Sequence, residues 1–415
     1  MISINRNLLK GFIISVFFFY YEMRFFPLTL HSIFLFLGLI SMIISLAIKK
    51  VETGFYSLKI SFDIIIAVIF SLIIIIGFIL NISTATFSNL QAYLLGVVCY
   101  IFVRLNAHLI SIDWFLKIVK FFLIINSILI LIQFITGVGF VATYFAAGDP
   151  LMIIPSGVSD GPTKNGMLHV FAMSLVLGQL IFSVNKKFIL NLYILILSFP
   201  GLILSASRAA MVAFAIVLTT TILVSLFSRN KKLFRNKKGI FSIFVLASII
   251  VVILINIGVV NILDNESKEL KQASDIVLFK LTATQDDSFS ERFENINIVE
   301  SIATKSWPSF ITFGIGVGSF ETINNGFNIH NSYLEVLLQT GLLGFSVFVT
   351  MLIYNFRKLF LSNNITTLIP IFLGLLAIMV FMTFHDILRG RIFWLPLALL
   401  MAYSNSSKLS LSEKS

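Results

Sequence analysis

Residues 61–80 read SFDIIIAVIFSLIIIIGFIL, an apolar stretch with one charged residue, Asp63. About 20 apolar residues in a helix cross the hydrocarbon core of a bilayer, so this segment predicts a transmembrane helix. The whole chain has this character, because 58% of its 415 residues are hydrophobic, only 12% are charged, and the mean hydropathy is +1.00. Soluble domains carry about a quarter charged residues. The composition excludes an ordinary soluble enzyme, and the long apolar runs favour helices over the alternating strands of a membrane barrel.

Similar apolar windows recur along the chain and predict an all-α polytopic membrane protein with twelve transmembrane helices. The predicted spans are 8–26, 28–48, 61–80, 88–105, 115–136, 166–184, 188–205, 209–228, 239–260, 331–355, 366–384 and 391–404. They divide the chain into five helices (1–136), an outer loop (137–165), four helices (166–260), a large outer loop (261–330), three helices (331–404) and a tail (405–415). The first residues mimic a signal peptide, with Arg6 and Lys10 at the start of an apolar stretch that extends to Tyr21. No small-residue cleavage site follows before Glu22, so we expect an uncleaved anchor.

The basic residues predict the orientation of these helices. Short cytoplasmic loops are enriched in Lys and Arg, and placing both termini in the cytoplasm puts 20 of the 30 basic residues on that side. The densest run, RNKKLFRNKK at 229–238, is then a topology anchor that touches anionic membrane lipid. The net charge of +11 therefore gives no reason to expect a nucleic-acid partner.

Two outer loops, 137–165 and 261–330, are longer than a simple connection requires, and such loops are usually functional or disordered. In the second loop, Ser288 and Glu291 match a capping box that predicts a helix start. Apolar residues follow at every third position, at Phe293, Ile296, Val299 and Ile302. We expect this loop to be folded, with its apolar stripe on the membrane surface or on the transmembrane body.

Arg208 lies in SASRAA (205–210), at the predicted outer start of the eighth span. A helix start attracts anions through its unpaired N–H groups and the helix dipole, and an Arg adds a bidentate fork suited to phosphate. An Arg at this position also fits a purely structural role, because long basic side chains snorkel to the membrane interface. The local sequence leaves both interpretations open.

His330 precedes a second predicted capping box, formed by Ser332 and Glu335, that would open the tenth span. The positive end of a helix disfavours a protonated imidazole, so this position predicts a neutral histidine that can take a proton from a hydroxyl. The alternative is a hydrogen-bonded structural histidine.

The motif GIGVGSF (314–320) has alternating glycines, but it lies in an outer loop between helices. A dinucleotide-binding motif needs a strand within a βαβ unit before it, so we interpret these residues as a tight, extended approach to the tenth span. The five histidines show no metal-ligand spacing with the one cysteine or with each other, and the sequence predicts neither a metal nor another cofactor.

Taken together, SASRAA (205–210), SERFENINIVESI (290–302), GIGVGSF (314–320) and HNSYLEVLLQTGLLGF (330–345) resemble the signature of the superfamily of O-antigen ligases and Wzy O-antigen polymerases. The resemblance covers residues from about 200 to 350 and rests on the order and spacing of these pieces. It implies a GT-C-like, lipid-linked glycosyltransferase of the inner membrane. Such an enzyme moves a glycan from undecaprenyl diphosphate to an acceptor hydroxyl on the periplasmic face, without nucleotide sugar or metal.

The resemblance also implies roles for residues. Arg208 and Arg292 match the arginines that hold the carrier diphosphate, and His330 matches a histidine that activates the acceptor, with Asn331 beside it as a substrate contact. In PSGVSDGPTKNG (155–166), Asp160 and Lys164 are assigned to substrate binding on a weaker match. Arg389 and Arg391, beside His385 and Asp386, are expected either to join the anion site or to anchor the last span at the interface.

Three functions remain open from the sequence. A polymerase transfers the glycan to another carrier-linked repeat unit, and we favour it because similarity outside the signature is low. A ligase transfers finished polymer to the lipid A core instead. A flippase for lipid-linked oligosaccharide also has many spans, but a transporter places ionisable groups at the membrane midplane. The expected partners are the lipid-linked oligosaccharide, membrane lipid and a chain-length regulator protein.

Overall fold

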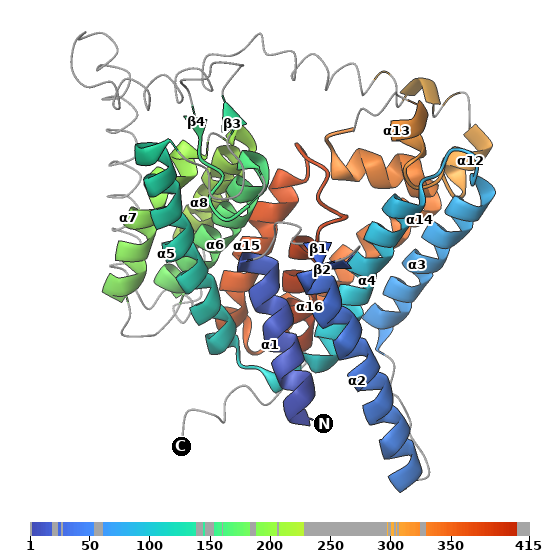
Figure 1. Ribbon diagram of the computed structural model, residues 1–415, viewed down its shortest axis with the longest axis horizontal. Coiled ribbons are helices and arrows are strands. Elements are labelled where there is room, and N and C mark those ends of the chain that lie inside the picture. The colour runs from blue at the N-terminus through green and yellow to red at the C-terminus, as the bar shows by residue number, and fades with distance from the viewer. Residues whose placement is uncertain are drawn as a thin grey trace.

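The computed structural model describes residues 2–18, 24–25, 28–53, 61–137, 144–145, 153–159, 161–182, 188–205, 207–227, 297, 300–302, 304, 307–323 and 329–404. Helices dominate these residues (Figure 1). The long helices are α1 (Ile2–Phe18), α2 (Leu30–Thr53), α3 (Phe62–Leu80), α4 (Phe87–Asn106), α5 (Ile112–Thr136), α6 (Pro162–Phe182), α7 (Phe188–Leu204), α8 (Arg208–Phe227), α14 (Ser332–Phe360), α15 (Ile365–Phe381) and α16 (Arg391–Ser404).

Several shorter elements connect the long helices. They are the 3-10 helix η1 (Ala107–Leu109), the one-turn helices α12 (Trp307–Ile311) and α13 (Ser319–Ile323), and two antiparallel pairs of short strands. The strands are β1 (Arg24–Phe25) with β2 (Leu28–Thr29), and β3 (Tyr144–Phe145) with β4 (Ile153–Ile154). In Figure 1, β3, β4, α12 and α13 lie at the end of the bundle opposite the start of α1.

A helix coincides with each predicted span except 239–260, which lies outside the described residues. Within the described part of the chain, five segments are long and apolar enough to cross a membrane: α3, Phe87–Leu109, α5, α6 and α14. The total number of spans and their orientation stay predictions. The predicted first span, 8–26, differs from helix α1, which runs from Ile2 to Phe18, and Arg24 and Phe25 pair with β2.

Helix α6 forms the centre of the fold. Its most apolar window is 94% buried inside the protein, compared with 39% for α3 and for α5. It packs against α5, α7, α8 and α15, and α15 in turn packs against α8 and α16. A helix surrounded by protein on all sides can carry polar groups inside the membrane when they are hydrogen-bonded. Because of this position, α6 rigidly supports the residues at its two ends.

Helix α14 is broken within its length, where the sequence predicts one continuous span at 331–355. Gly341 has φ 69° and ψ −178°, a conformation that ends the helical hydrogen bonding at this point. A break inside a membrane leaves carbonyl groups that need new donors. The N–H groups of Ile315 and Gly316 supply them, donating to the carbonyls of Leu338 (3.0 Å) and Gln339 (3.1 Å).

The glycine motif therefore differs from the extended approach expected from the sequence. Gly314, Gly316 and Gly318 have φ values of 71°, 86° and 79°, so the backbone turns left-handed at every second residue. Only glycine adopts this region without strain. The motif folds into the break of α14, and its last two residues, Ser319 and Phe320, begin α13.

Candidate functional site

Two helix starts meet at one end of the bundle. A Cβ on Gly166, in the first turns of α6, would lie 2.5 Å from the Cβ of Ser207, the residue just before α8. Lys164 lies in the first turn of α6, Arg208 is the first residue of α8, and neither first turn contains an acidic residue. Each helix start also contributes the partial positive charge of its dipole. We call Lys164, Arg208 and the two helix starts the cationic helix starts.

A buried polar network holds the loop before α6. Gly157 has φ 58°, its N–H donates to Oε1 of Gln133 (2.8 Å), and its carbonyl accepts from Nε2 of Gln133 (3.2 Å). Oδ1 of Asn126 accepts from the N–H of Val158 (3.1 Å). These contacts connect the loop to α5 and position the start of α6, which carries Lys164.

His169, one turn further along α6, completes this network and has a structural role. Its Nε2 lies 2.7 Å from the carbonyl oxygen of Ser198, which can only accept, so Nε2 carries the proton. Its Nδ1 then accepts from Nδ2 of Asn126 at 3.0 Å. Both ring nitrogens are thereby used, and the fully buried ring is neutral.

The start of α14 lies level with the cationic helix starts. Cβ positions built on Gly178 and Gly374 meet Pro370 of α15 and Phe171 of α6, respectively, so α6 and α15 run antiparallel. The end of α15 is thus at the level at which α6 begins. There the carbonyl of Met382 accepts from the N–H of Ser332, the first residue of α14 (2.9 Å).

The cap of α14 differs from the predicted capping box. Asn331 is the N-cap, and its Oδ1 accepts from the N–H groups of Tyr333 (3.0 Å) and Leu334 (3.1 Å). The hydroxyl of Ser332 instead donates to the carbonyl of His385 (2.7 Å) and accepts from the N–H of Ile387 (2.8 Å). Ser332 therefore connects α14 to the loop between α15 and α16.

His330 is held in an unusual conformation beside this connection. It has φ 50°, the one positive φ among the described residues other than glycine. Its ring lies edge-on to the ring of His385, with the centroids 6.1 Å apart, and His385 stacks on Phe381 at 4.8 Å. Such strained residues concentrate at functional sites because the surrounding structure must hold them.

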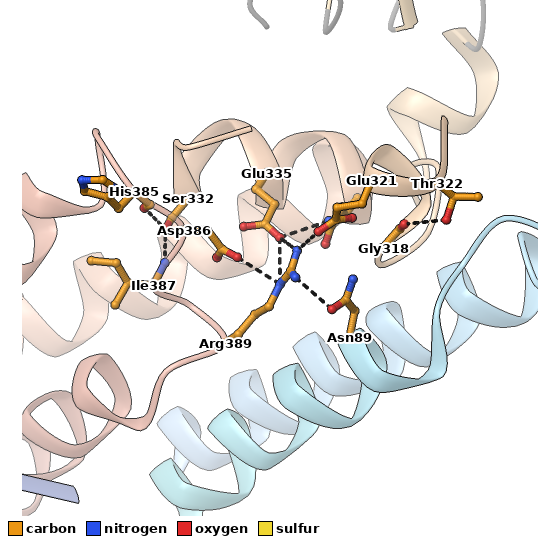
Figure 2. A network of polar contacts seen from close by, with 11 residues as sticks. Asn89, Gly318, Glu321, Thr322, Ser332, Glu335, His385, Asp386, Ile387 and Arg389 are labelled. Carbon is orange, nitrogen blue, oxygen red and sulfur yellow. Dashed lines mark hydrogen bonds and ion pairs between the residues drawn. The ribbon is translucent and has the colours of Figure 1, made fainter. Parts of the chain in front are cut away.

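Three carboxylates surround Arg389 (Figure 2). Glu321 of α13 and Glu335 of α14 both form ion pairs with Nη2 of Arg389, and Asp386 lies 3.1 Å from its Nε. Oδ1 of Asn89 in α4 accepts from Nη1 at 2.8 Å. We call Glu321, Glu335 and Asp386 the carboxylate cluster.

The cluster determines the charge state of Arg389. Burial lowers its pKa, but the negative charges of Glu335, Asp386 and Glu321 outweigh this effect and raise the pKa above its ordinary value. The guanidinium is therefore charged, and the carboxylates outnumber it three to one. The described residues include no group of three or more His, Cys, Asp or Glu that could hold a metal ion, and here the guanidinium occupies the centre.

The remaining predicted residues are distributed as follows. Nη2 of Arg391 donates to Oγ of Ser32 in α2 (3.0 Å), so this side chain joins α16 to α2. Asp160, Arg292 and the predicted capping box at Ser288 and Glu291 lie outside the described residues. The anion-binding roles of Arg389 and Arg391, and the substrate contact of Asn331, stay predictions, although all three side chains have protein partners.

The sequence analysis missed the carboxylate cluster. Glu335 fits a capping box, and this local explanation gave no reason to expect its long-range partner, Arg389. Glu321 and Asn89 are 68 and 300 residues away from Arg389 in the chain. A signal that could have found Glu335 is its place in an apolar segment, because a charge there needs a partner.

The fold and site define a helical membrane protein with a cationic and an acidic centre at one end. Residues 193–349 match the family model described as O-antigen ligase, a stretch that runs from α7 into α14. This match confirms the predicted resemblance and supports activity of the O-antigen ligase or polymerase type in general. It contains Arg208, Glu321, His330 and Glu335 but not Arg389. A search of curated proteins finds no match.

Proposed function

We propose that the protein is a metal-independent glycosyltransferase of the inner membrane that polymerises a surface polysaccharide. It transfers glycan from an undecaprenyl diphosphate-linked repeat unit to a sugar hydroxyl of the acceptor, on the outer face. A chain-length regulator is its expected protein partner. The proposal rests on the match over residues 193–349 together with the chemistry of the described site.

The gathering of the cationic helix starts carries this proposal. In glycosyl transfer from a lipid diphosphate, the bond between the anomeric carbon and the phosphate oxygen breaks, and negative charge grows on the departing diphosphate. Preorganised donors that face developing charge are among the largest contributions to catalysis. Lys164 and Arg208 are cationic donors of this kind, and the dipoles of the two adjacent helices that start at Pro162 and Arg208 add partial positive charge.

His330 is the proposed base for the acceptor hydroxyl. It lies at the start of α14, level with the cationic helix starts, and its ring lies edge-on to that of His385. A general base must come within hydrogen-bond reach of the proton that it removes, and a position at this end of the bundle suits an acceptor that arrives along the membrane surface.

A ligase is the second candidate function, because the matching family model is described as O-antigen ligase. The two activities give different products when the gene is deleted. Loss of a polymerase leaves one repeat unit on each acceptor core, whereas loss of a ligase leaves polymer that is unattached to the core.

The test is complementation of the deletion strain with Arg208→Ala and His330→Ala, followed by gel analysis of the surface polysaccharide. Arg357→Ala is the matched control, because Arg357 is exposed near the far end of α14. We expect both site variants to lose the polymer and the control to retain it. Full-length ladders from well-expressed Arg208→Ala and His330→Ala would overturn the proposal.

A further inference from the structure

The carboxylate cluster has more hydrogen-bond acceptors than the protein satisfies. Oε2 of Glu321, Oε2 of Glu335 and Oδ1 of Asp386 are buried and have no hydrogen-bond partner among the described residues. Arg389 supplies N–H donors to one oxygen of each side chain and leaves the other oxygen unpaired. Buried acceptors without donors are costly.

Gln339 provides independent support for a ligand at this place. It lies one turn after Glu335, is 1% exposed, and donates from Nε2 to Oε1 of Glu335 at 3.1 Å. Its own Oε1 is buried and unpartnered among the described residues. The amide N–H of Gln339 thus points into the cluster, and the oxygen of the same amide is an additional neutral acceptor beside it. The buried hydroxyl of Tyr93 interacts with Glu335 and can supply one donor. A ligand that satisfies the remaining oxygens must supply further hydrogen-bond donors.

The sign of the cluster excludes the diphosphate as that ligand. Arg389 is already paired with carboxylates, and even two ionised carboxylates outnumber its guanidinium, so the cluster repels a phosphate anion, whereas the cationic helix starts attract it. Hydroxyl groups are donors without charge, and a sugar carries several of them. Carboxylate and amide oxygens accept bonds from such hydroxyl groups.

On the basis of the function proposed above, we infer that the carboxylate cluster and Gln339 bind the hydroxyl groups of the acceptor sugar. Access is from the side of Glu321 and Asp386. Their side chains are 16% and 17% exposed although their unpaired oxygens are themselves buried, whereas the side chain of Glu335 is 3% exposed. The two substrates are thereby separated by charge, with the donor diphosphate at the cationic helix starts and the acceptor hydroxyls at the carboxylate cluster.

The position of His330 fits this assignment. Asp386 directly follows His385, whose ring contacts that of His330, and Glu335 lies little more than one helical turn after His330. An acceptor held by Asp386 and Glu335 therefore lies beside the proposed base. We expect the cluster to bind and orient the acceptor while His330 takes the proton from its attacking hydroxyl.

Binding of two different ligands to the full-length protein in nanodiscs tests the two binding sites separately. One is undecaprenyl diphosphate, which has no sugar, and the other is the carrier-free repeat-unit oligosaccharide from the producing strain, which has no diphosphate. The variants are Glu321→Gln and Asp386→Asn, which replace one oxygen by an N–H donor. Asp63→Asn is the matched control, because Asp63 forms an ion pair with Arg104 (2.9 Å) far from the cluster.

We expect each cluster variant to weaken oligosaccharide binding by about tenfold or more, the loss typical of a hydrogen bond to a charged group. Undecaprenyl diphosphate binding should stay unchanged, and Asp63→Asn should change neither. Oligosaccharide affinity that is equal in wild type, Glu321→Gln and Asp386→Asn would overturn the inference. Undecaprenyl diphosphate binding that survives Arg208→Ala would instead count against the proposed function, so the two failures are distinguishable.

Discussion

Arg208 and Arg389 lie at the same end of the protein, and the sequence makes both of them candidates for an anion site, yet their described surroundings differ. Arg208 begins a helix beside a second helix start that carries Lys164, with no acidic residue in either first turn. Arg389 is enclosed by three carboxylates from α13, α14 and the loop before α16. The guanidinium of Arg208 is thus a candidate ligand for phosphate, whereas that of Arg389 is the counterion of acidic side chains.

This comparison predicts that removing each of the two arginines has a different effect on the protein. Loss of Arg389 should reduce stability, because it leaves three carboxylates close together with no cation. Loss of Arg208 should reduce activity and leave the fold intact.

The largest expected effect is that of Arg389→Ala on stability. Removing one partner of a buried ion pair costs about 3 to 5 kcal/mol, and the double variant Arg389→Ala/Glu335→Gln should recover part of this loss. Thermal unfolding in nanodiscs measures both, with Arg357→Ala as the exposed control. An Arg389→Ala variant of wild-type stability that loses undecaprenyl diphosphate binding would show that the comparison is wrong.

Arg208→Ala should raise the barrier to glycan transfer by about 2 to 4 kcal/mol, as for other preorganised donors to a developing anion. This corresponds to a loss in rate of about 30-fold to 1,000-fold. Rates of polymer formation with purified enzyme measure the effect, and the melting temperature should stay near that of wild type. If activity persists while the protein melts earlier, Arg208 has a structural role.

Gly341→Ala should destabilise the part of the protein that holds the carboxylate cluster. A Cβ there would lie 2.4 Å from the carbonyl oxygen of Thr312, and φ of 69° is strained for alanine. We expect a loss of about 1 to 3 kcal/mol in the free energy of unfolding. Leu342→Ala, at an exposed neighbour, is the control. Equal stability of the two variants would indicate that the glycine motif does not depend on this break.

The smallest expected effect is that of Asn331→Ala, which removes the cap of α14. Loss of an N-cap costs about 1 kcal/mol, and Asn331→Asp should retain the stability because its carboxylate also caps. Thermal unfolding again provides the measurement. A loss of activity in Asn331→Asp without a change in stability would favour the predicted substrate contact.

The sequence predicts the helices better than their contacts. Lipid requires long apolar helices, so the segment at 61–80 predicts α3 (Phe62–Leu80) to within one residue. Hydropathy does not detect the break at Gly341, because residues on both sides of it are apolar. The break depends instead on the glycine motif that folds into it, and no local pattern indicates this long-range packing.

The same distinction between local features and long-range contacts applies to the site. Arg208 could be predicted because a helix start is a local feature that sequence reveals. The partners of Arg389 could not, because Glu321 and Asn89 reach it through tertiary packing. The meeting of Gly166 with Ser207, which brings Lys164 and Arg208 to adjacent helix starts, is likewise a property of the fold.

The most direct test is a structure of the full-length protein in nanodiscs with undecaprenyl diphosphate bound. We predict that the diphosphate lies at the starts of α6 and α8, within hydrogen-bond distance of the guanidinium of Arg208. A diphosphate bound to Arg389 in place of its carboxylates, or one that avoids both helix starts, would contradict the account.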